Sequence, residues 1–507
     1  MIVIASNFEG TCVEKGIKED VYMSIEKNST NAGYPFKRNF YYDIEKAIEK
    51  SNVVFLLGPR KCGKTVALLQ LEKSRSNVKY YNFKILTQDE SMDLFDAIKS
   101  AMEEDRDVVF LLDEITYAYQ PEKEINEVSI QLSDKPCKNT KIVFTGSQSV
   151  ALEAWANRAF CGNVSMIRTD FLNYSEWLSY KGIKESSEAS YSHFLYEIDE
   201  FYGFVSLEDY LRGCLEETII SNQKTDNIIM GNDVYLVDID SLLDICYATL
   251  FTLHNHVNSH KFAKNDKLNE TIRFYFRDIC KQIGADEIGE RIAASFIGKY
   301  NDFKSKDLDT LKQAFQFLHR IGLITITPVS DSIESIPNIR RDLSISDSRI
   351  NYKDELFKSY NVCIKYPMFY MAILKDILKE NLPEKLPTAL LGSIVECHVR
   401  GLLPEKGTFE FQDIEGHEVD YVNVRDCIAL EITISNKRSN EMNFKYLPAD
   451  YQQITLTRDI GEICENRMQI PYHEFIRITA DAYLNVFLGE ESVKQNGMQQ
   501  SNKKGGR

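Results

Sequence analysis

The chain has 507 residues, of which 43% are hydrophobic and 27% are charged, and at about 150 residues per domain this length predicts about three domains. Its 60 Lys and Arg residues stand against 76 Asp and Glu residues, a net charge of −16, which argues against non-specific binding to nucleic acid or to an anionic membrane. The 11 cysteines never form a C-x-x-C pair, a pattern typical of reduced thiols rather than of a disulfide framework or a zinc ribbon.

The hydropathy of the chain and its N-terminus predict a cytoplasmic protein with no membrane partner. No uncharged apolar run approaches the ~18 residues that a membrane-spanning helix needs. The first residues, MIVIASNFEGTCVEKG, lack the basic segment and the long apolar segment of a signal peptide. Residues 1–36 are polar and weakly patterned, so we predict an N-terminal arm there.

Residues 37–185 alternate between strand and helix patterns. A helical pattern begins near Phe40, and the apolar run VVFLL ends abruptly at Gly58-Pro59. The strand candidates are residues 53–57, 78–83, 108–113 and 141–147, with helical segments between them. This alternation predicts an α/β fold with a doubly wound parallel sheet, whose strands end at a common edge.

The segment GPRKCGKT, residues 58–65, matches the phosphate-binding pattern G-x-x-x-x-G-K-[ST]. Backbone N–H groups of such a loop converge on phosphate oxygens, and the following helix adds its positive end. Lys64 would contact the β- and γ-phosphates of ATP, and the Thr65 hydroxyl would bind Mg²⁺. The candidate nucleotide-binding residues are Gly58, Pro59, Arg60, Lys61, Cys62, Gly63, Lys64 and Thr65. A chance Gly-rich turn would lack the buried strand before it and the helix after it.

Two further strand ends carry polar residues that suit ATP hydrolysis. Asp113 and Glu114 follow an apolar strand, where Asp113 would hold Mg²⁺ and Glu114 would act as general base toward water. Thr145 ends the next strand and would orient that water or sense the γ-phosphate; an ordinary strand-to-loop turn is the alternative. An arginine acting on the nucleotide would come from Arg158, Arg168 or a neighbouring subunit.

Residues 186–345 have mainly helical patterns. An amphipathic stripe near residues 311–318 precedes Gly322 and the strand-like LITITPV, an order compatible with a winged helix. The charges around this module nearly cancel, so packing against protein and binding to DNA both stay open. Strands and helices mix again over 346–489, and the polar residues 490–507 predict a disordered tail.

The motifs GPRKCGKT, FLLDEI, VFTGSQS and FLNYSEWL together resemble a family of prokaryotic AAA-type ATPases. Members of that family typically end in an uncharacterised domain similar to restriction endonucleases. DTLKQAFQFLHRIGLI resembles the end of their winged helix, and LLGSIVECHVRGLL, GHEVDYV and ALEITIS resemble their terminal domain. The resemblance covers roughly residues 37–480. It departs at Gly162-Asn163, where the family usually has Gly-Arg.

The resemblance implies a PD-(D/E)xK-like acid set at Glu396, Asp420 and Glu431. Two such carboxylates bind Mg²⁺ in active nucleases, and a lysine two residues after the last acid activates water. That position is Thr433 here, and Lys437 would lie ~13 Å beyond it on an extended strand. We therefore expect no nuclease activity; Asp420 and Glu431 either bind a metal without cutting or are a structural relic.

These observations predict an enzyme, an ATP-binding and Mg²⁺-dependent AAA-type ATPase that acts as a switch or remodelling module. One alternative is an ATP-regulated DNA-binding or nuclease-related protein. Another is a nucleotide-binding signalling scaffold with slow turnover. The expected cofactors are ATP and Mg²⁺. The sequence leaves open a protein partner, DNA and assembly into a homo-oligomer.

Overall fold

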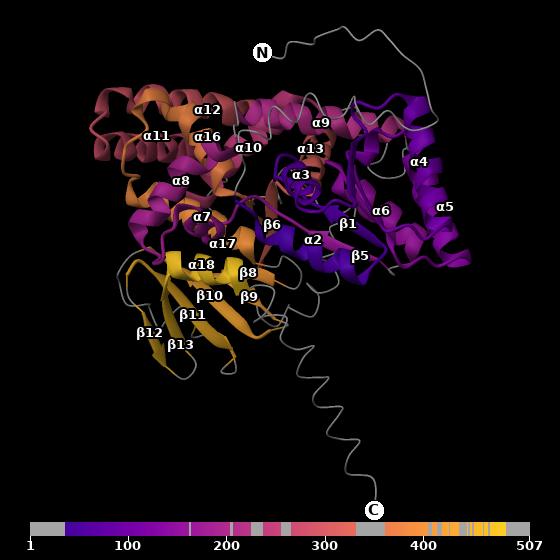
Figure 1. Cartoon of the computed structure of the whole chain (residues 1–507). Coiled ribbons are helices and arrows are strands. Elements are labelled where there is room, and N and C mark those ends of the chain that lie inside the picture. The colour runs from indigo at the N-terminus through magenta and orange to yellow at the C-terminus, as the bar shows by residue number, and fades with distance from the viewer. Residues whose placement is uncertain are drawn as a thin grey trace, which may run out of the picture. The chain divides into compact units, whose positions relative to one another are not determined.

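The computed structural model in Figure 1 describes residues 36–482 apart from internal gaps. The gaps are 162–163, 203–205, 225–236, 255–264, 331–359, 404–407, 413–417, 425, 435–443, 445–446, 449–450, 460 and 465–466. The chain forms two compact units: an N-terminal unit that ends at Asp170, with residues 220–229 added, and a C-terminal unit made of the rest. The predicted arm and tail lie outside the described residues. The domain boundaries at 185, 345 and 489 stay predictions.

The N-terminal unit contains a five-stranded parallel sheet with the strand order β2-β3-β4-β1-β5. The strands are β1 (Val53–Leu57), β2 (Val78–Asn82), β3 (Val108–Asp113), β4 (Thr140–Thr145) and β5 (Ser165–Arg168). The predicted parallel α/β sheet is therefore confirmed. Sequence reasoning missed β5, because its four residues SMIR have no apolar run.

Helices cover both faces of this sheet, as a doubly wound fold requires. Because side chains alternate along a strand, Phe55 of β1 packs with the helices α4 (Gln88–Glu103), α5 (Pro121–Asp134) and α6 (Ser149–Phe160). Its neighbours Val54 and Leu56 pack with α2 (Asn39–Lys50) and α3 (Lys64–Ser74) on the other face. All five residues of β1 are buried, so the strand before the loop is fixed from both sides.

The C-terminal unit consists mainly of helices and a second sheet. The helices are α7 (Tyr174–Lys181), α8 (Glu188–Tyr202), α9 (Leu207–Lys224), α10 (Ile239–His254), α11 (Asn265–Gln282), α12 (Gly289–Ser305), α13 (Leu308–Arg320), α16 (Pro367–Leu378), α17 (Thr388–Leu402) and α18 (Tyr472–Ala482). The last residues of α9 group with the N-terminal unit. No described helix is long and apolar enough to cross a membrane.

The second sheet is mixed, with the strand order β12-β13-β11-β10-β9-β8-β6-β7. Its strands are β6 (Ile324–Ser330), β7 (Tyr360–Ile364), β8 (Thr408–Gln412), β9 (Glu418–Asn423), β10 (Ile428–Ile432), β11 (Gln452–Thr457), β12 (Glu462–Cys464) and β13 (Arg467–Pro471). The strand expected after the winged-helix stripe is β6, which pairs antiparallel with β7 and parallel with β8. It is thus part of the large C-terminal sheet, and the winged helix stays a prediction.

Candidate nucleotide site

The loop of residues 58–65 joins the carboxyl end of β1 to the first turn of α3, the context that the motif requires. Gly63 has a φ of 99° in the left-handed region, which glycine adopts without steric cost. At Gly58, a Cβ atom would lie 2.5 Å from Thr169 Cγ2 and 2.7 Å from the Thr169 carbonyl oxygen. Both glycines are therefore needed for the path of this loop.

The side chain of Lys64 lies inside the loop. Its Nζ donates hydrogen bonds to the carbonyl oxygens of Gly58 (2.9 Å) and Pro59 (2.7 Å), and the residue is only 6% exposed. From outside, Arg38 Nη1 donates to the carbonyl oxygens of Cys62 (2.7 Å) and Asp170 (2.8 Å). The loop is thus held in place, with a cation within its curve where phosphate binding requires one.

Asp113 ends β3 and lies against the loop. Its Oδ2 accepts hydrogen bonds from Thr65 Oγ1 (2.7 Å) and from the Tyr80 hydroxyl (2.8 Å). Burial, followed by the charge of Glu114, raises the pKa of Asp113 to about 6. Thr65 and Asp113 supply adjacent oxygen atoms of the kind that Mg²⁺ prefers, so these residues fit the ion.

Glu114 follows in a left-handed conformation, with φ 54° and ψ 42°, which is uncommon for a residue other than glycine. Its carboxylate accepts hydrogen bonds from Ser147 N–H (3.1 Å) and Ser147 Oγ (2.8 Å), and pairs with Lys84 Nζ (3.1 Å). Although burial alone would raise the pKa of Glu114, Lys84 and Ser147 hold it below its usual value. The carboxylate is therefore ionised at neutral pH, as a general base must be.

The segment TGSQS, residues 145–149, makes hydrogen bonds to β1, to Glu114 and to the loop. The Thr145 hydroxyl is fully buried and donates to the carbonyl oxygen of Leu56 in β1 (2.8 Å). Ser147 binds Glu114, and Ser149 Oγ accepts from Gly58 N–H (2.6 Å). Sequence reasoning selected Thr145 as the polar residue of this strand end, but the structure places Ser147 next to the expected general base.

Sequence reasoning also missed Tyr80 and Lys84. Both lie in or after β2, which borders β3 with Tyr80 opposite Leu111 and Asn82 opposite Asp113. The strand itself was predicted, but only its pairing with β3 shows that a tyrosine hydroxyl and a lysine reach the acidic pair.

The arginines considered for the nucleotide make ion pairs elsewhere. Arg158 pairs with Glu122 at 2.8 Å, and Arg168 pairs with Glu153. Gly162-Asn163 lies outside the described residues. The role of either arginine toward the nucleotide stays a prediction.

The acids of the C-terminal unit lie on the elements that the resemblance implies: Glu396 on α17, Asp420 on β9 and Glu431 on β10. Burial, followed by the charges of Glu431 and Glu396, raises the pKa of Asp420 well above its usual value. The backbone N–H of Thr433 donates to the Leu456 carbonyl oxygen (3.1 Å), and Lys437 lies outside the described residues. Within the described ranges, no group of three or more His, Cys, Asp or Glu side chains is arranged to hold a metal ion.

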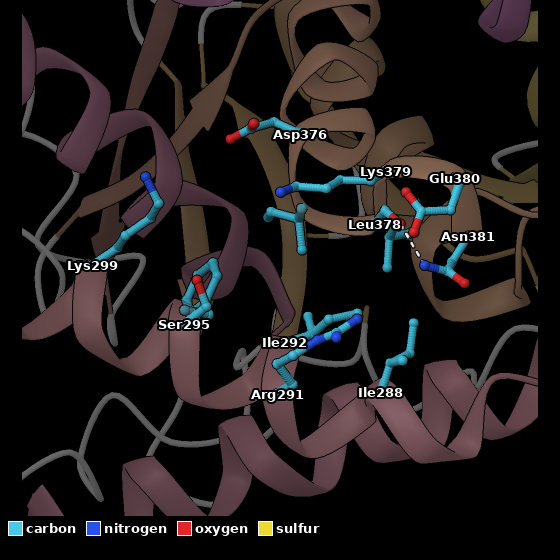
Figure 2. Close-up of a pocket in the computed structure, with 12 residues that line it drawn as sticks. Ile288, Arg291, Ile292, Ser295, Lys299, Asp376, Leu378, Lys379, Glu380 and Asn381 are labelled. Carbon is cyan, nitrogen blue, oxygen red and sulfur yellow. Dashed lines mark hydrogen bonds between the residues drawn. The ribbon is translucent and has the colours of Figure 1, made fainter.

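A separate cavity of about 760 Å³ lies between α12 and the end of α16 (Figure 2). It contains none of the residues that the sequence analysis selected. Three lining residues are positively charged, Arg291, Lys299 and Lys379, and two are negatively charged, Asp376 and Glu380. The two signs nearly cancel, so the charge of the lining does not indicate a class of ligand.

Fold and site together define a P-loop nucleotide-binding domain in the N-terminal unit. Residues 50–178 match the family model described as an AAA domain, so the chain contains an AAA domain. No curated protein matches the chain.

Solved structures of replication initiators align with more than half of the chain. AMPPCP-bound DnaA from Aquifex aeolicus has 14% identity and a TM-score of 0.24, over 55% of this chain and 93% of its own. The Aeropyrum pernix ORC1 protein in complex with DNA has 11% identity and a TM-score of 0.23, over 57% and 84%. Cdc6p from Pyrobaculum aerophilum has 14% identity and a TM-score of 0.24, over 58% and 90%. Scores this low carry no structural argument, so the assignment rests on the domain match.

Replacing Tyr80 by phenylalanine tests its contact with Asp113. We expect Tyr80→Phe to lower the free energy of unfolding by about 1–2 kcal/mol, because a buried carboxylate loses one of its donors. Urea denaturation measures this change. Tyr119→Phe is the matched control, since Tyr119 is 48% exposed and its variant should unfold like the unmodified protein. Equal stability of both variants would contradict a structural role for the Tyr80 hydroxyl.

Thr145 and Ser147 can be separated by their effects on stability and on ATP turnover. We expect Thr145→Val to cost about 1 kcal/mol of stability and to change turnover little, because its hydroxyl binds only the β1 backbone. Ser147→Ala should raise kcat about tenfold, because Glu114 loses one of the three donor contacts that occupy the lone pairs of its carboxylate. Denaturation and steady-state kinetics on both variants measure these effects, and the reverse pattern would restore Thr145 as the sensing residue.

Proposed function

We propose that the N-terminal unit binds ATP with Mg²⁺ and hydrolyses it, and that the protein is an AAA-type ATPase used as a switch or remodelling module. The hydrogen bond of 2.7 Å between Thr65 Oγ1 and Asp113 Oδ2 carries this proposal. It unites the loop and the acidic strand, which are 48 residues apart in sequence, in the arrangement that a phosphate-bound Mg²⁺ needs.

Each residue of the site has a defined task under this proposal. The loop's N–H groups and Lys64 bind the phosphates, and the tight path set by Gly58 and Gly63 lets the backbone approach them closely. Thr65 and Asp113 hold Mg²⁺, which when bound neutralises charge on the transferred phosphoryl group. Glu114 takes the proton of the attacking water.

The contacts of Glu114 support the proposal that the protein acts as a switch. Lys84 and Ser147 together direct three donor contacts at its carboxylate, and each contact engages a lone pair that could accept a proton from water. The rate of hydrolysis therefore depends on how many of these contacts persist when the nucleotide binds. A protein whose base is restrained in this way turns over slowly unless another event releases the base.

The finer assignments of the rest of the chain are also proposals. The order of α13, β6 and β7 supports a winged helix. The positions of Glu396, Asp420 and Glu431 on a helix and two neighbouring strands support a restriction-endonuclease-like fold. Cytoplasmic location is proposed from the sequence arguments alone, which leave open a protein partner, DNA and homo-oligomer formation.

Two substitutions test the ATPase assignment. We expect Lys64→Ala to abolish ATP binding, because the loop loses its cation. Glu114→Gln should bind ATP normally and reduce turnover by at least about 100-fold, the contribution of a positioned general base. Fluorescent nucleotide binding and steady-state hydrolysis, each with and without Mg²⁺, measure these effects. Lys181→Ala is a matched control, because Lys181 lies on α7 outside the nucleotide loop and makes an exposed ion pair with Glu197. Tight ATP binding by Lys64→Ala would refute the assignment.

The same assay with and without DNA separates the alternatives. Turnover that rises with DNA favours the DNA-directed protein, and turnover indifferent to DNA favours action on a protein. Binding without turnover favours the signalling scaffold.

A further inference from the structure

A buried arginine lies among the nuclease-like acids of the C-terminal unit. Arg400 is on α17 and only 3% exposed, although taking a charged side chain out of water is costly. Three carboxylates surround it: Glu396 from the same helix, Glu410 from β8 and Asp420 from β9. We call these four residues the Arg400 cluster.

The three carboxylates converge on one nitrogen atom. Arg400 Nη2 lies 2.9 Å from Glu396 Oε1, 2.9 Å from Glu410 Oε2 and 3.7 Å from Asp420 Oδ1. Arg400 Nε also donates to Glu396 Oε1 at 2.9 Å. One cation thus connects a helix and two strands, the kind of link that a divalent ion makes in a nuclease site.

Other donors fix the same carboxylates. Asn361 Nδ2 donates to Glu410 Oε2 at 2.7 Å, so this oxygen accepts two hydrogen bonds. The backbone N–H of Ile432 donates to Asp420 Oδ2. Oxygen atoms that accept these bonds are turned toward their donors, which disfavours their convergence on a separate ion.

We infer that Arg400 takes the place of a divalent ion beside Glu396, Glu410 and Asp420, so that two of the three nuclease-like acids, Glu396 and Asp420, belong to a metal-independent internal salt bridge and do not support cleavage. A divalent ion needs its oxygen ligands at 2.0–2.6 Å, and the point between these carboxylates is filled by a guanidinium that also repels the ion. The residues do not fit Mg²⁺. This inference concerns the C-terminal unit alone and holds whether or not the N-terminal unit hydrolyses ATP.

The sequence itself contains a sign of this arrangement, which a search for acidic residues alone does not find. Glu396 and Arg400 are four residues apart on α17, so they share one face of the helix. This part of α17 is buried on all sides, because the consecutive residues Glu396, Cys397, His398, Val399 and Arg400 are all shielded from solvent. In this chain, the arginine four residues after the helix acid is the sequence signal of the inferred salt bridge.

Binding of Mn²⁺, measured by electron paramagnetic resonance, tests this inference. The full-length Asp113→Asn protein is the parent, because it lacks the carboxylate proposed to hold an ion at the nucleotide loop. We expect the parent to bind no Mn²⁺ at concentrations up to about 1 mM, the range of weak carboxylate sites. Adding Arg400→Met, an unbranched apolar side chain of similar length, should create one Mn²⁺ site per chain, and adding Asp420→Asn should remove it again.

Two further variants separate charge from folding. Arg400→Lys keeps one positive charge and should stay free of Mn²⁺. Arg477→Met removes an arginine from a partly exposed pair with Glu474 and should behave as the parent does. An ion bound by the parent and lost on Asp420→Asn would overturn the inference, as would a folded Arg400→Met protein that binds no ion. If Arg400→Met does not fold, Mn²⁺ binding by the parent and by the parent with Asp420→Asn still tests the inference, because binding that is lost on Asp420→Asn would contradict it.

Discussion

The parallel pairing of β1, β4 and β3 is the constraint on which the nucleotide site depends. Val54 pairs with Val143, and Leu111 pairs with the same residue from the other side. Because parallel strands run in one direction, their carboxyl ends meet at one edge of the sheet. The loop, the TGSQS segment and the acidic pair are far apart in sequence, and this pairing alone brings them within hydrogen-bond distance. A shift of one residue in register would turn their side chains to the opposite face.

The sequence predicted the parts of this site whose chemistry is local. The loop pattern has its own glycines, lysine and threonine at fixed spacing, and the apolar run before Asp113 and Glu114 identifies a buried strand. Contacts between strands were not predictable in the same way. Tyr80 and Lys84 look like ordinary strand and turn residues until the register of β2 against β3 is known. Ser147 and Thr145 are chemically similar, so only the geometry of the strand end distinguishes them.

The C-terminal unit shows the same limit. The helix and strands that carry Glu396, Asp420 and Glu431 were expected from resemblance to a nuclease-like domain, whereas Glu410 and Arg400 were not selected because neither belongs to that motif. A motif defined by acids says nothing about a cation that lies among them. The guanidinium of Arg400 lies within 4 Å of three carboxylates. This arrangement can be recognised only from the packing of α17 against the sheet.

The two units use buried carboxylates in opposite ways. Asp113 receives hydroxyl donors from Thr65 and Tyr80, which are neutral and, in the case of Thr65, can themselves bind a metal ion. Asp420 receives a backbone N–H and lies beside a guanidinium, which supplies positive charge permanently. Neutral donors leave a carboxylate dependent on an external cation and therefore open to regulation by it. Under the inference drawn for Arg400, a built-in arginine removes that dependence, so the chemistry proposed for this protein would be confined to the N-terminal unit and the acids around Arg400 would serve the stability of their own fold.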